Sequence, residues 1–185
     1  MPTHAPSRLA EKEKKDKPPR KKHKIWLVVL LVVVALALAA VAGVAAAYAG
    51  LLPVSRAALP DLNARTGSLN APDPNAQAPD GGYIITINAE PVMTAGETSC
   101  NLEIENLPGN TDACVVELMM ADTLEAIYTS YRVEPGKYVE TVDLGRTFEP
   151  GVYNLIARHH LYTGNEESSS PIDFPVSLYV LEAGT

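Results

Sequence analysis

Cysteine is scarce in this chain of 185 residues, which contains only two. Cys100 and Cys114 are separated by 13 residues, and this spacing excludes a CxxC redox motif. Neither lies near the end of the N-terminal apolar run, so a lipoprotein-type lipid anchor is not indicated. HExxH and GxSxG motifs are also lacking, as is a Ser-His-Asp grouping in a recognisable context. We therefore expect a protein that is not an enzyme and needs no cofactor.

Histidine is also rare, and only His159 and His160 follow the apolar run. Adjacent residues of a strand point to opposite faces, so these two side chains are poorly placed to share one metal ion. Alternation assigns His159 to the face of Leu155 and Ala157, as a buried structural residue, and His160 to the solvated face. We expect no metal site here.

Charge is absent from residues 25–55, and the sequence is almost wholly aliphatic as far as residue 52. A helix rises about 1.5 Å per residue, so about 20 residues cross a hydrocarbon core of about 30 Å. Residues 25–52 are therefore predicted to form a single transmembrane helix. Trp26 and Tyr48 lie near its two ends, where amphipathic rings favour the membrane interface.

The charge of the chain is segregated on the two sides of this run. Residues 1–24 carry nine Lys and Arg side chains against three acidic ones, whereas the whole chain has a net charge of -7. Lys21, Lys22 and Lys24 lie nearest the apolar run and are expected at the membrane interface. The positive-inside rule then places a disordered tail, residues 1–24, in the cytoplasm and the acidic remainder outside the cell membrane. The tail has no interleaved aromatic residues, so we expect the lipid bilayer, and not nucleic acid, as its partner.

A cleaved signal peptide is the alternative to an anchor, because residues 47–49 have the small-x-small pattern of a cleavage site. The apolar run exceeds the roughly 7–15 residues of an ordinary signal-peptide core, so the uncleaved anchor is preferred. Small residues spaced by four, Gly43 with Ala47 and Ala46 with Gly50, would allow the helix to self-associate. Such pairs also arise by chance in an Ala-rich stretch.

Residues 53–81 contain five prolines among many Ala, Asn and Asp residues. This composition cannot build a core, so the segment is predicted to be a linker between the membrane and a folded domain. A flexible chain of this length has a mean reach of about 30 Å.

Residues 82–185 alternate short β-rich runs with turn residues, and no stretch has convincing helical periodicity. About seven strands are expected, at residues 83–88, 100–106, 114–120, 126–133, 138–144, 152–162 and 172–181. This pattern predicts an all-β fold, an antiparallel sandwich of immunoglobulin (Ig) or fibronectin type. Pro150-Gly151-Val152-Tyr153 resembles the start of one strand of such folds, so the Tyr153 hydroxyl is expected to bond back to the preceding corner.

Several turn and strand patterns recur together in this domain: NLEIENLPGN from residue 101, VEPG from 133, PGVY from 150 and YTGNEE from 162. In these the stretch 101–167 resembles a domain of membrane-anchored proteins of Gram-positive bacteria. The resemblance implies an extracytoplasmic Ig-like domain of the cell envelope, but no activity and no functional residues. The family does not generally have cysteine at the positions of Cys100 and Cys114, so the pair looks like a local addition.

The two cysteines share the inward-facing parity of their strands, in a compartment that permits disulfides. A Cys100–Cys114 disulfide is the preferred prediction. It would close a loop of about 15 residues and contribute roughly 3 kcal/mol in the chain-entropy model. The alternative is two buried free thiols.

Tyrosine is the abundant aromatic residue of the predicted domain. Tyr128, Tyr162 and Tyr179 are predicted to lie opposite the aliphatic stripes, where a rigid ring with a polar tip suits a recognition surface. Ordinary cross-strand pairing is the alternative explanation. The scattered acidic residues, Glu103 and Glu105 among them, are expected to face solvent.

The sequence therefore predicts a single-pass membrane protein that displays a non-enzymatic Ig-like interaction domain at the bacterial cell envelope. Its partner would be an envelope protein or a glycan. The alternative is a structural or accessory subunit of a larger membrane assembly, in which the anchor helix and basic tail make the decisive contacts.

Overall fold

A computed structural model describes residues 22–184, except residues 50, 52–53, 72 and 81. The chain forms two compact units, Met1–Ala49 and Gly50–Thr185, and each is described by itself. Most of the predicted basic tail, including Lys21, lies outside the described residues. The side chains of Lys22 and Lys24 lie outside them too, so the interface role predicted for the three lysines stays a prediction.

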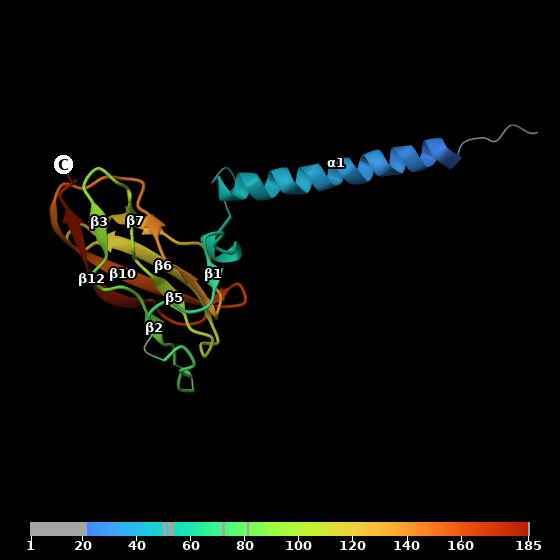
Figure 1. The fold of residues 1–185 in the computed structure, drawn as a ribbon. Coiled ribbons are helices and arrows are strands. Elements are labelled where there is room, and N and C mark those ends of the chain that lie inside the picture. The colour runs from blue at the N-terminus through green and yellow to red at the C-terminus, as the bar shows by residue number, and fades with distance from the viewer. Residues whose placement is uncertain (1–21, 50, 52–53, 72, 81, 185) are drawn as a thin grey trace, which may run out of the picture. The chain divides into compact units, whose positions relative to one another are not determined.

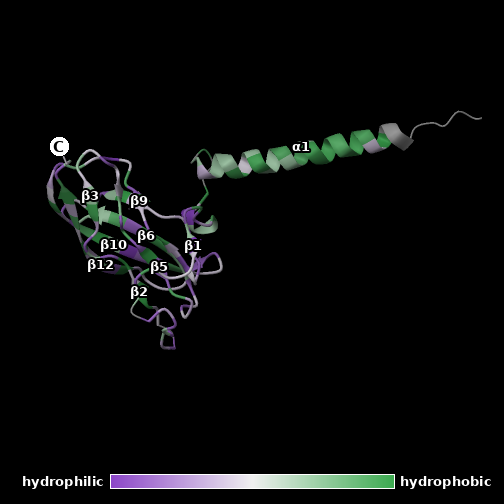
Figure 2. Cartoon of the chain, in the orientation of Figure 1, coloured by the Kyte–Doolittle hydropathy of each residue, from purple (hydrophilic) through white to green (hydrophobic). Residues whose placement is uncertain are grey.

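In the described residues of the first unit the chain forms one helix, α1 (Lys22–Tyr48). Residues Ile25–Tyr48 are long and apolar enough to cross a membrane, a property that anchors and signal sequences share. The side chains are exposed along most of the helix, and Figure 2 shows its predominantly hydrophobic colouring. Trp26 is 75% exposed near one end. The helix ends at Tyr48, short of the predicted residue 52, and the helix-breaking residues Gly50 and Pro53 follow in the sequence.

The second unit is mostly β-sheet. It contains the short 3-10 helix η1 (Arg56–Ala58). Its strands are β1 (Arg65–Thr66), β2 (Ile85–Thr86), β3 (Val92–Thr94), β4 (Ser99–Cys100), β5 (Ile104–Asn106), β6 (Ala113–Met120), β7 (Ala126–Thr129), β8 (Lys137–Val139), β9 (Val142–Asp143), β10 (Gly151–Thr163), β11 (Glu166–Glu167) and β12 (Ile172–Leu181). The expectation of a mostly β unit after one N-terminal helix is confirmed.

These strands form two main sheets in a sandwich-like arrangement (Figure 1). The smaller sheet has the order β1-β8-β5-β2, and the larger has β3-β12-β10-β6-β7, with β11 beside β10. A short third sheet pairs β4 with β9. One buried cluster joins side chains from both main sheets, such as Ile104 and Val139 from the smaller and Leu118 and Leu155 from the larger.

Alternation along the long strands builds this core. On β10, residues Leu155, Ala157, His159 and Leu161 are buried, and the residues between them are only partly buried. His159 is 2% exposed, so its predicted inward face is correct. The Tyr153 hydroxyl donates a hydrogen bond to the Glu149 carbonyl oxygen at 3.0 Å, which confirms the predicted bond back to the corner.

Two predicted strands are each broken in the middle. The stretch 100–106 divides into β4 and β5, and 138–144 divides into β8 and β9. Strands β5 and β8 belong to the smaller main sheet, whereas β4 and β9 form the short third sheet. At the break Glu103 has a φ of 53°, in the left-handed region that non-glycine residues rarely occupy. Its backbone N–H donates to the Glu140 carbonyl at 3.1 Å. A strand that changes from one sheet to another keeps its alternating apolar residues, so the sequence pattern does not indicate the change.

The sequence predicts a wholly antiparallel sandwich, but one pair of strands is parallel. Strand β3 pairs in parallel with β12, and Val92 lies opposite Tyr179. The three-residue β3 follows Pro91 and is too short to produce a recognisable alternation in the sequence. The sequence pattern therefore did not predict strand β3.

The predicted linker, residues 53–81, is folded onto the β-rich unit over its described part. An entry segment, residues 55–66, contains η1 and β1. Asp61 is 7% exposed, and its carboxylate accepts hydrogen bonds from the backbone N–H groups of Asn63 at 2.9 Å and Tyr131 at 3.1 Å. Strand β1 pairs with β8, so that Arg65 lies opposite Tyr138. Polar bonds to the domain backbone, which composition does not reveal, hold this segment in place.

Candidate functional site

The three tyrosines predicted as a recognition surface are not brought together. Tyr128 lies directly opposite Leu118 and packs against the core, and burial raises the pKa of its hydroxyl. Tyr162 and Tyr179 do share the outer face of the larger sheet. However, Tyr179 lies opposite Val152, about ten positions along β10 from Tyr162, or roughly 33 Å at about 3.3 Å per residue. The structure favours the cross-strand alternative for these residues.

The predicted disulfide is not formed. Cys100 and Cys114 are free, buried thiols within the core cluster. Burial raises the pKa of Cys100 to about 12 and that of Cys114 to about 11, which leaves both thiols protonated and unreactive at neutral pH. The shared inward parity reflects core packing, because Cys100 pairs with Val142 and Cys114 with Leu161 in different sheets.

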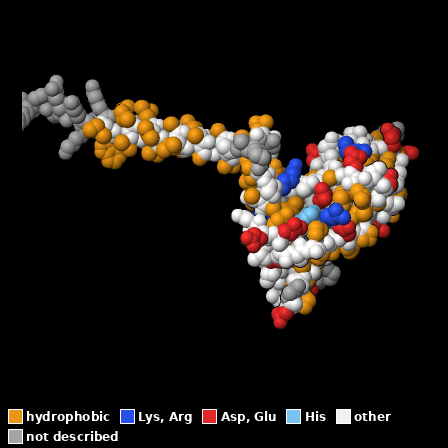
Figure 3. Space-filling model, turned by 180° about the vertical axis from the view of Figure 1, so that it is seen from behind, with side chains coloured by type: hydrophobic (Ala, Val, Ile, Leu, Met, Phe, Trp, Pro, Cys, Tyr) orange, Lys and Arg blue, Asp and Glu red, His pale blue; other side chains and the backbone are white. Residues whose placement is uncertain are grey.

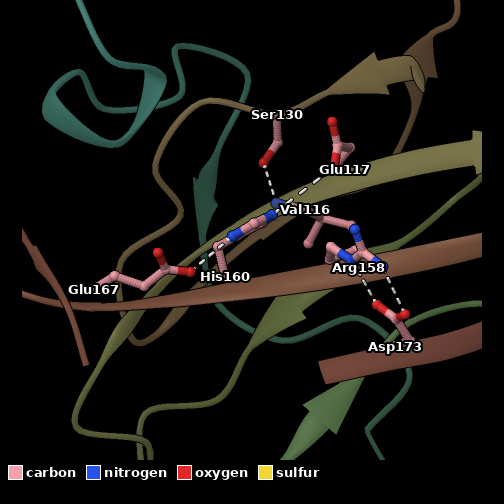
Figure 4. A network of polar contacts seen from close by, with 7 residues as sticks. All are labelled: Val116, Glu117, Ser130, Arg158, His160, Glu167 and Asp173. Atoms are coloured by element: carbon pink, nitrogen blue, oxygen red, sulfur yellow. Dashed lines mark hydrogen bonds and ion pairs between the residues drawn. The ribbon is translucent and has the colours of Figure 1, made fainter. Parts of the chain in front are cut away.

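The outer face of the larger sheet carries a network of paired charges (Figure 4). Arg158 donates two hydrogen bonds to the Asp173 carboxylate, at 2.8 and 2.9 Å. His160 Nδ1 lies 2.8 Å from Glu167 Oε1, and its Nε2 lies 3.9 Å from Glu117. In the space-filling view acidic and basic side chains are interspersed on one face of this unit (Figure 3). The charged side chains of this network pair with one another, so we assign the outer face of the larger sheet to solvent.

A groove of about 570 Å³ lies on the other side, beside the smaller sheet. This volume is within the range of small-molecule sites. The cover segment, defined as residues 67–78, contributes part of the lining, and the extended stretch 84–89 contributes another part. The remaining lining residues are Glu103, Glu105, Leu107 and Phe174.

Glu105 is the unusual residue of this groove. It lies between Thr86 of β2 and Tyr138 of β8, on the face of the smaller sheet that points away from the core residue Ile104. An outward residue would ordinarily be solvated, yet Glu105 is 3% exposed and its Oε1 has no hydrogen-bond partner among the described residues. Native structures contain few such groups, because a buried polar atom without a partner costs about 1–3 kcal/mol, and more when it is charged.

The cover segment lines the same groove as Glu105 and is held on the domain. Its Gly67 N–H donates to the Gly136 carbonyl, and its Ala78 N–H donates to the Gly109 carbonyl, so both ends are held on turns of the domain. Gly109 permits the close approach, since an added Cβ there would collide with the Ala76 carbonyl oxygen.

Buried asparagines position the opposite side of the groove. The Asn110 side chain bonds both backbone groups of Ile84: its Oδ1 accepts from the N–H at 2.8 Å and its Nδ2 donates to the carbonyl at 3.0 Å. Its Nδ2 also donates to Asn106 Oδ1 at 2.9 Å. Asn106 in turn donates to the carbonyls of Asp112 and Val133. The extended stretch at Ile84 therefore rests on a hydrogen-bonded core network.

The groove is acidic. Besides Glu105, its lining includes Glu103 and Asp73, and none of its lining residues is Lys, Arg or His. The Glu103 carboxylate is already engaged, by the Asn70 amide at 2.8 Å and the Asn101 amide at 3.3 Å. No group of three or more His, Cys, Asp or Glu side chains suited to a metal ion occurs among the described residues.

Sequence reasoning missed Glu105 because strand alternation assigned it, correctly, to the outward face. The side chain lines a groove shared with the cover segment, whose composition is typical of a linker. The sequence shows Gly109 and Asn110 next to each other, but this pair of residue types predicts only a turn and not a groove.

These features define a β-rich domain with an acidic groove, preceded in the chain by an apolar helix. No family model matches the sequence, and no curated protein sequence matches it. Among solved structures, the crystal structure of CopC from Methylosinus trichosporium OB3b is similar over 55% of this chain and 98% of its own, with 10% sequence identity and a TM-score of 0.33. A TM-score this low does not establish a shared fold, and we base no argument on it.

Proposed function

We propose that this chain is a single-pass membrane protein that presents an Ig-like β-sandwich as a non-enzymatic binding module of the cell envelope. The groove beside the smaller sheet is the binding site. The observation that carries the proposal is the buried Glu105 carboxylate, whose Oε1 lacks a partner and which lines a groove of ligand size. The Ig-like assignment is supported by the bond from Tyr153 to the preceding corner and by the two facing sheets.

The proposed topology places the tail in the cytoplasm and the β-rich unit outside, as the basic N-terminal flank favours. Since both native cysteines are buried, single added cysteines report the side of the membrane. We expect Ser169→Cys in intact cells to react with a membrane-impermeant maleimide, and Ser7→Cys to react only after lysis. The reverse pattern would contradict this orientation. Loss of residues 1–49 from the mature protein would instead establish a cleaved signal peptide.

Photo-crosslinking tests the binding site. We expect a benzophenone amino acid at Leu69, which lines the groove, to capture a specific envelope component in the native membrane. The matched position is Val152, which is 59% exposed on the outer face of the larger sheet. Capture from Val152 and not from Leu69 would move the binding surface away from the groove.

Replacing residues 25–48 by an unrelated apolar helix separates this proposal from the assembly-subunit alternative. A displayed binding module retains the Leu69 cross-link after the exchange. A subunit held through its helix loses its association with neighbouring membrane proteins.

A further inference from the structure

We propose that the groove binds an organic cation, an ammonium group on an apolar body, with the Glu105 carboxylate as its counter-ion. This inference rests on the proposed function, because it names the ligand class of the same site. Three observations support it: the unsatisfied carboxylate oxygen, the sign of the surrounding charge and the apolar lining.

The Glu105 carboxylate is the first observation. A carboxylate has two oxygens that accept hydrogen bonds, and Oε1 of Glu105 has no donor among the described residues. This oxygen is closed to solvent while its residue lines the groove, so a ligand reaches it by displacing part of the groove lining. A ligand ammonium provides three donors and the opposite charge. Charge-assisted hydrogen bonds of this kind are stronger than neutral ones, particularly where water is excluded.

The surrounding charge excludes an anionic ligand. Glu103 and Asp73 accompany Glu105 in the lining, and no cationic side chain there offsets them. Glu103 cannot take the place of Glu105 as the counter-ion without giving up its bonds to the amides of Asn70 and Asn101. The Asp73 carboxylate already accepts a hydrogen bond from the Asn75 backbone N–H at 2.9 Å. Glu105 is therefore the carboxylate left for a ligand.

The lining favours an organic cation over a metal ion. Leu69, Ile85, Leu107 and Phe174 contribute to it, and most of its exposed area is apolar. Ca²⁺ takes six to eight oxygen ligands, whereas no group of three or more acidic, His or Cys side chains suited to a metal ion occurs among the described residues. An alkyl or aryl body buries apolar surface here, and an aromatic ring such as that of Phe174 also attracts a nearby cation.

The test uses phenethylamine, which is cationic at neutral pH, with phenethyl alcohol and phenylacetate as neutral and anionic probes of similar shape. The full chain, labelled with ¹⁵N in a detergent micelle, is titrated with each probe and followed by NMR. We expect saturable shifts of the amide signals of Thr86, Glu105 and Leu107 with the amine. The alcohol should bind at least about tenfold more weakly, since it lacks the charge-assisted contact.

Matched variants assign the effect to one carboxylate. Glu105→Gln keeps the shape of the side chain and should weaken amine binding at least about tenfold. Glu97→Gln removes the same charge from an exposed turn outside the groove and should leave binding unchanged. Unaltered signals elsewhere in the spectrum of Glu105→Gln would establish that it is folded.

The outcomes distinguish this inference from the proposed function. Equal binding of amine and alcohol, or unchanged amine binding by Glu105→Gln, would overturn the cation assignment, and a Leu69 cross-link would then still support the groove as a site. If no probe shifts the groove signals and Leu69 captures nothing, both proposals fail.

Discussion

Replacing Asn106 by alanine is expected to lower the free energy of unfolding by about 3–4 kcal/mol. Asn106 is fully buried, and its amide makes three hydrogen bonds, to the Asp112 and Val133 carbonyls and with Asn110. Truncation breaks these bonds, leaves buried polar atoms with fewer partners and opens a small cavity. The variant should also loosen the backbone at Ile84, because Asn110, a partner of Asn106, bonds both the N–H and the carbonyl of Ile84.

Urea unfolding of the full chain in detergent, followed by tyrosine fluorescence, measures this effect. All tyrosines except Tyr48 lie in the β-rich unit, so the signal reports mainly on that unit. Asn70→Ala is the control, because Asn70 is exposed and bonds only Glu103 in the described structure, and it should change stability by less than about 0.5 kcal/mol. Similar midpoints for the two variants would show that the buried network contributes little.

Acidification should destabilise the β-rich unit well above the range in which carboxylates titrate. His159 is buried, and burial lowers its pKa to about 4, from about 6.5 in an unfolded chain. Between these values the unfolded state binds the proton and the folded state does not, so stability falls as the pH drops. The slope approaches about 1.4 kcal/mol per pH unit, and the accumulated loss between pH 6.5 and pH 4 is about 3 kcal/mol.

His159→Leu isolates this effect, because leucine fills a similar volume between Val116 and Ile172 without titrating. The variant should have nearly constant stability between pH 6.5 and pH 4.5. Asp112 and Asp173 have lowered pKa values, because hydroxyl groups donate to the first and Arg158 donates to the second, so their contribution is lost at still lower pH. An unchanged slope in the variant would assign the acid sensitivity to another group.

The elements that could be predicted from the sequence are those whose pattern is local and long. The apolar run predicted α1. Alternation over many residues predicted β6, β10 and β12, and also the inward position of the His159 side chain. Tyr153 was predictable because the residue that fixes its role, the corner at Glu149, is only four positions away. In each case the determining contacts lie within the element or beside it.

The candidate site could not be predicted, because it depends on contacts between distant segments. Glu105 lines a groove together with a cover segment whose Pro, Asn and Asp content resembles that of a linker. That segment folds back because backbone groups at Gly67 and Ala78 find partners about 70 and 30 residues further along the chain. The predicted disulfide failed for a related reason, since equal inward parity does not fix how near two thiols on different strands come to each other.

The bonded entry segment has a mechanical consequence. Tension transmitted along the chain from the side of α1 meets Arg56 and Asp61 before it reaches any core strand, so the bonds from Arg56 to the Thr129 carbonyl and from Tyr131 to Asp61 bear the load first. The next contacts in line are those of β1 with β8, and after them those of the cover segment that lines the groove. A pull at this end would therefore act on the cover segment before it reaches the long strands of the larger sheet.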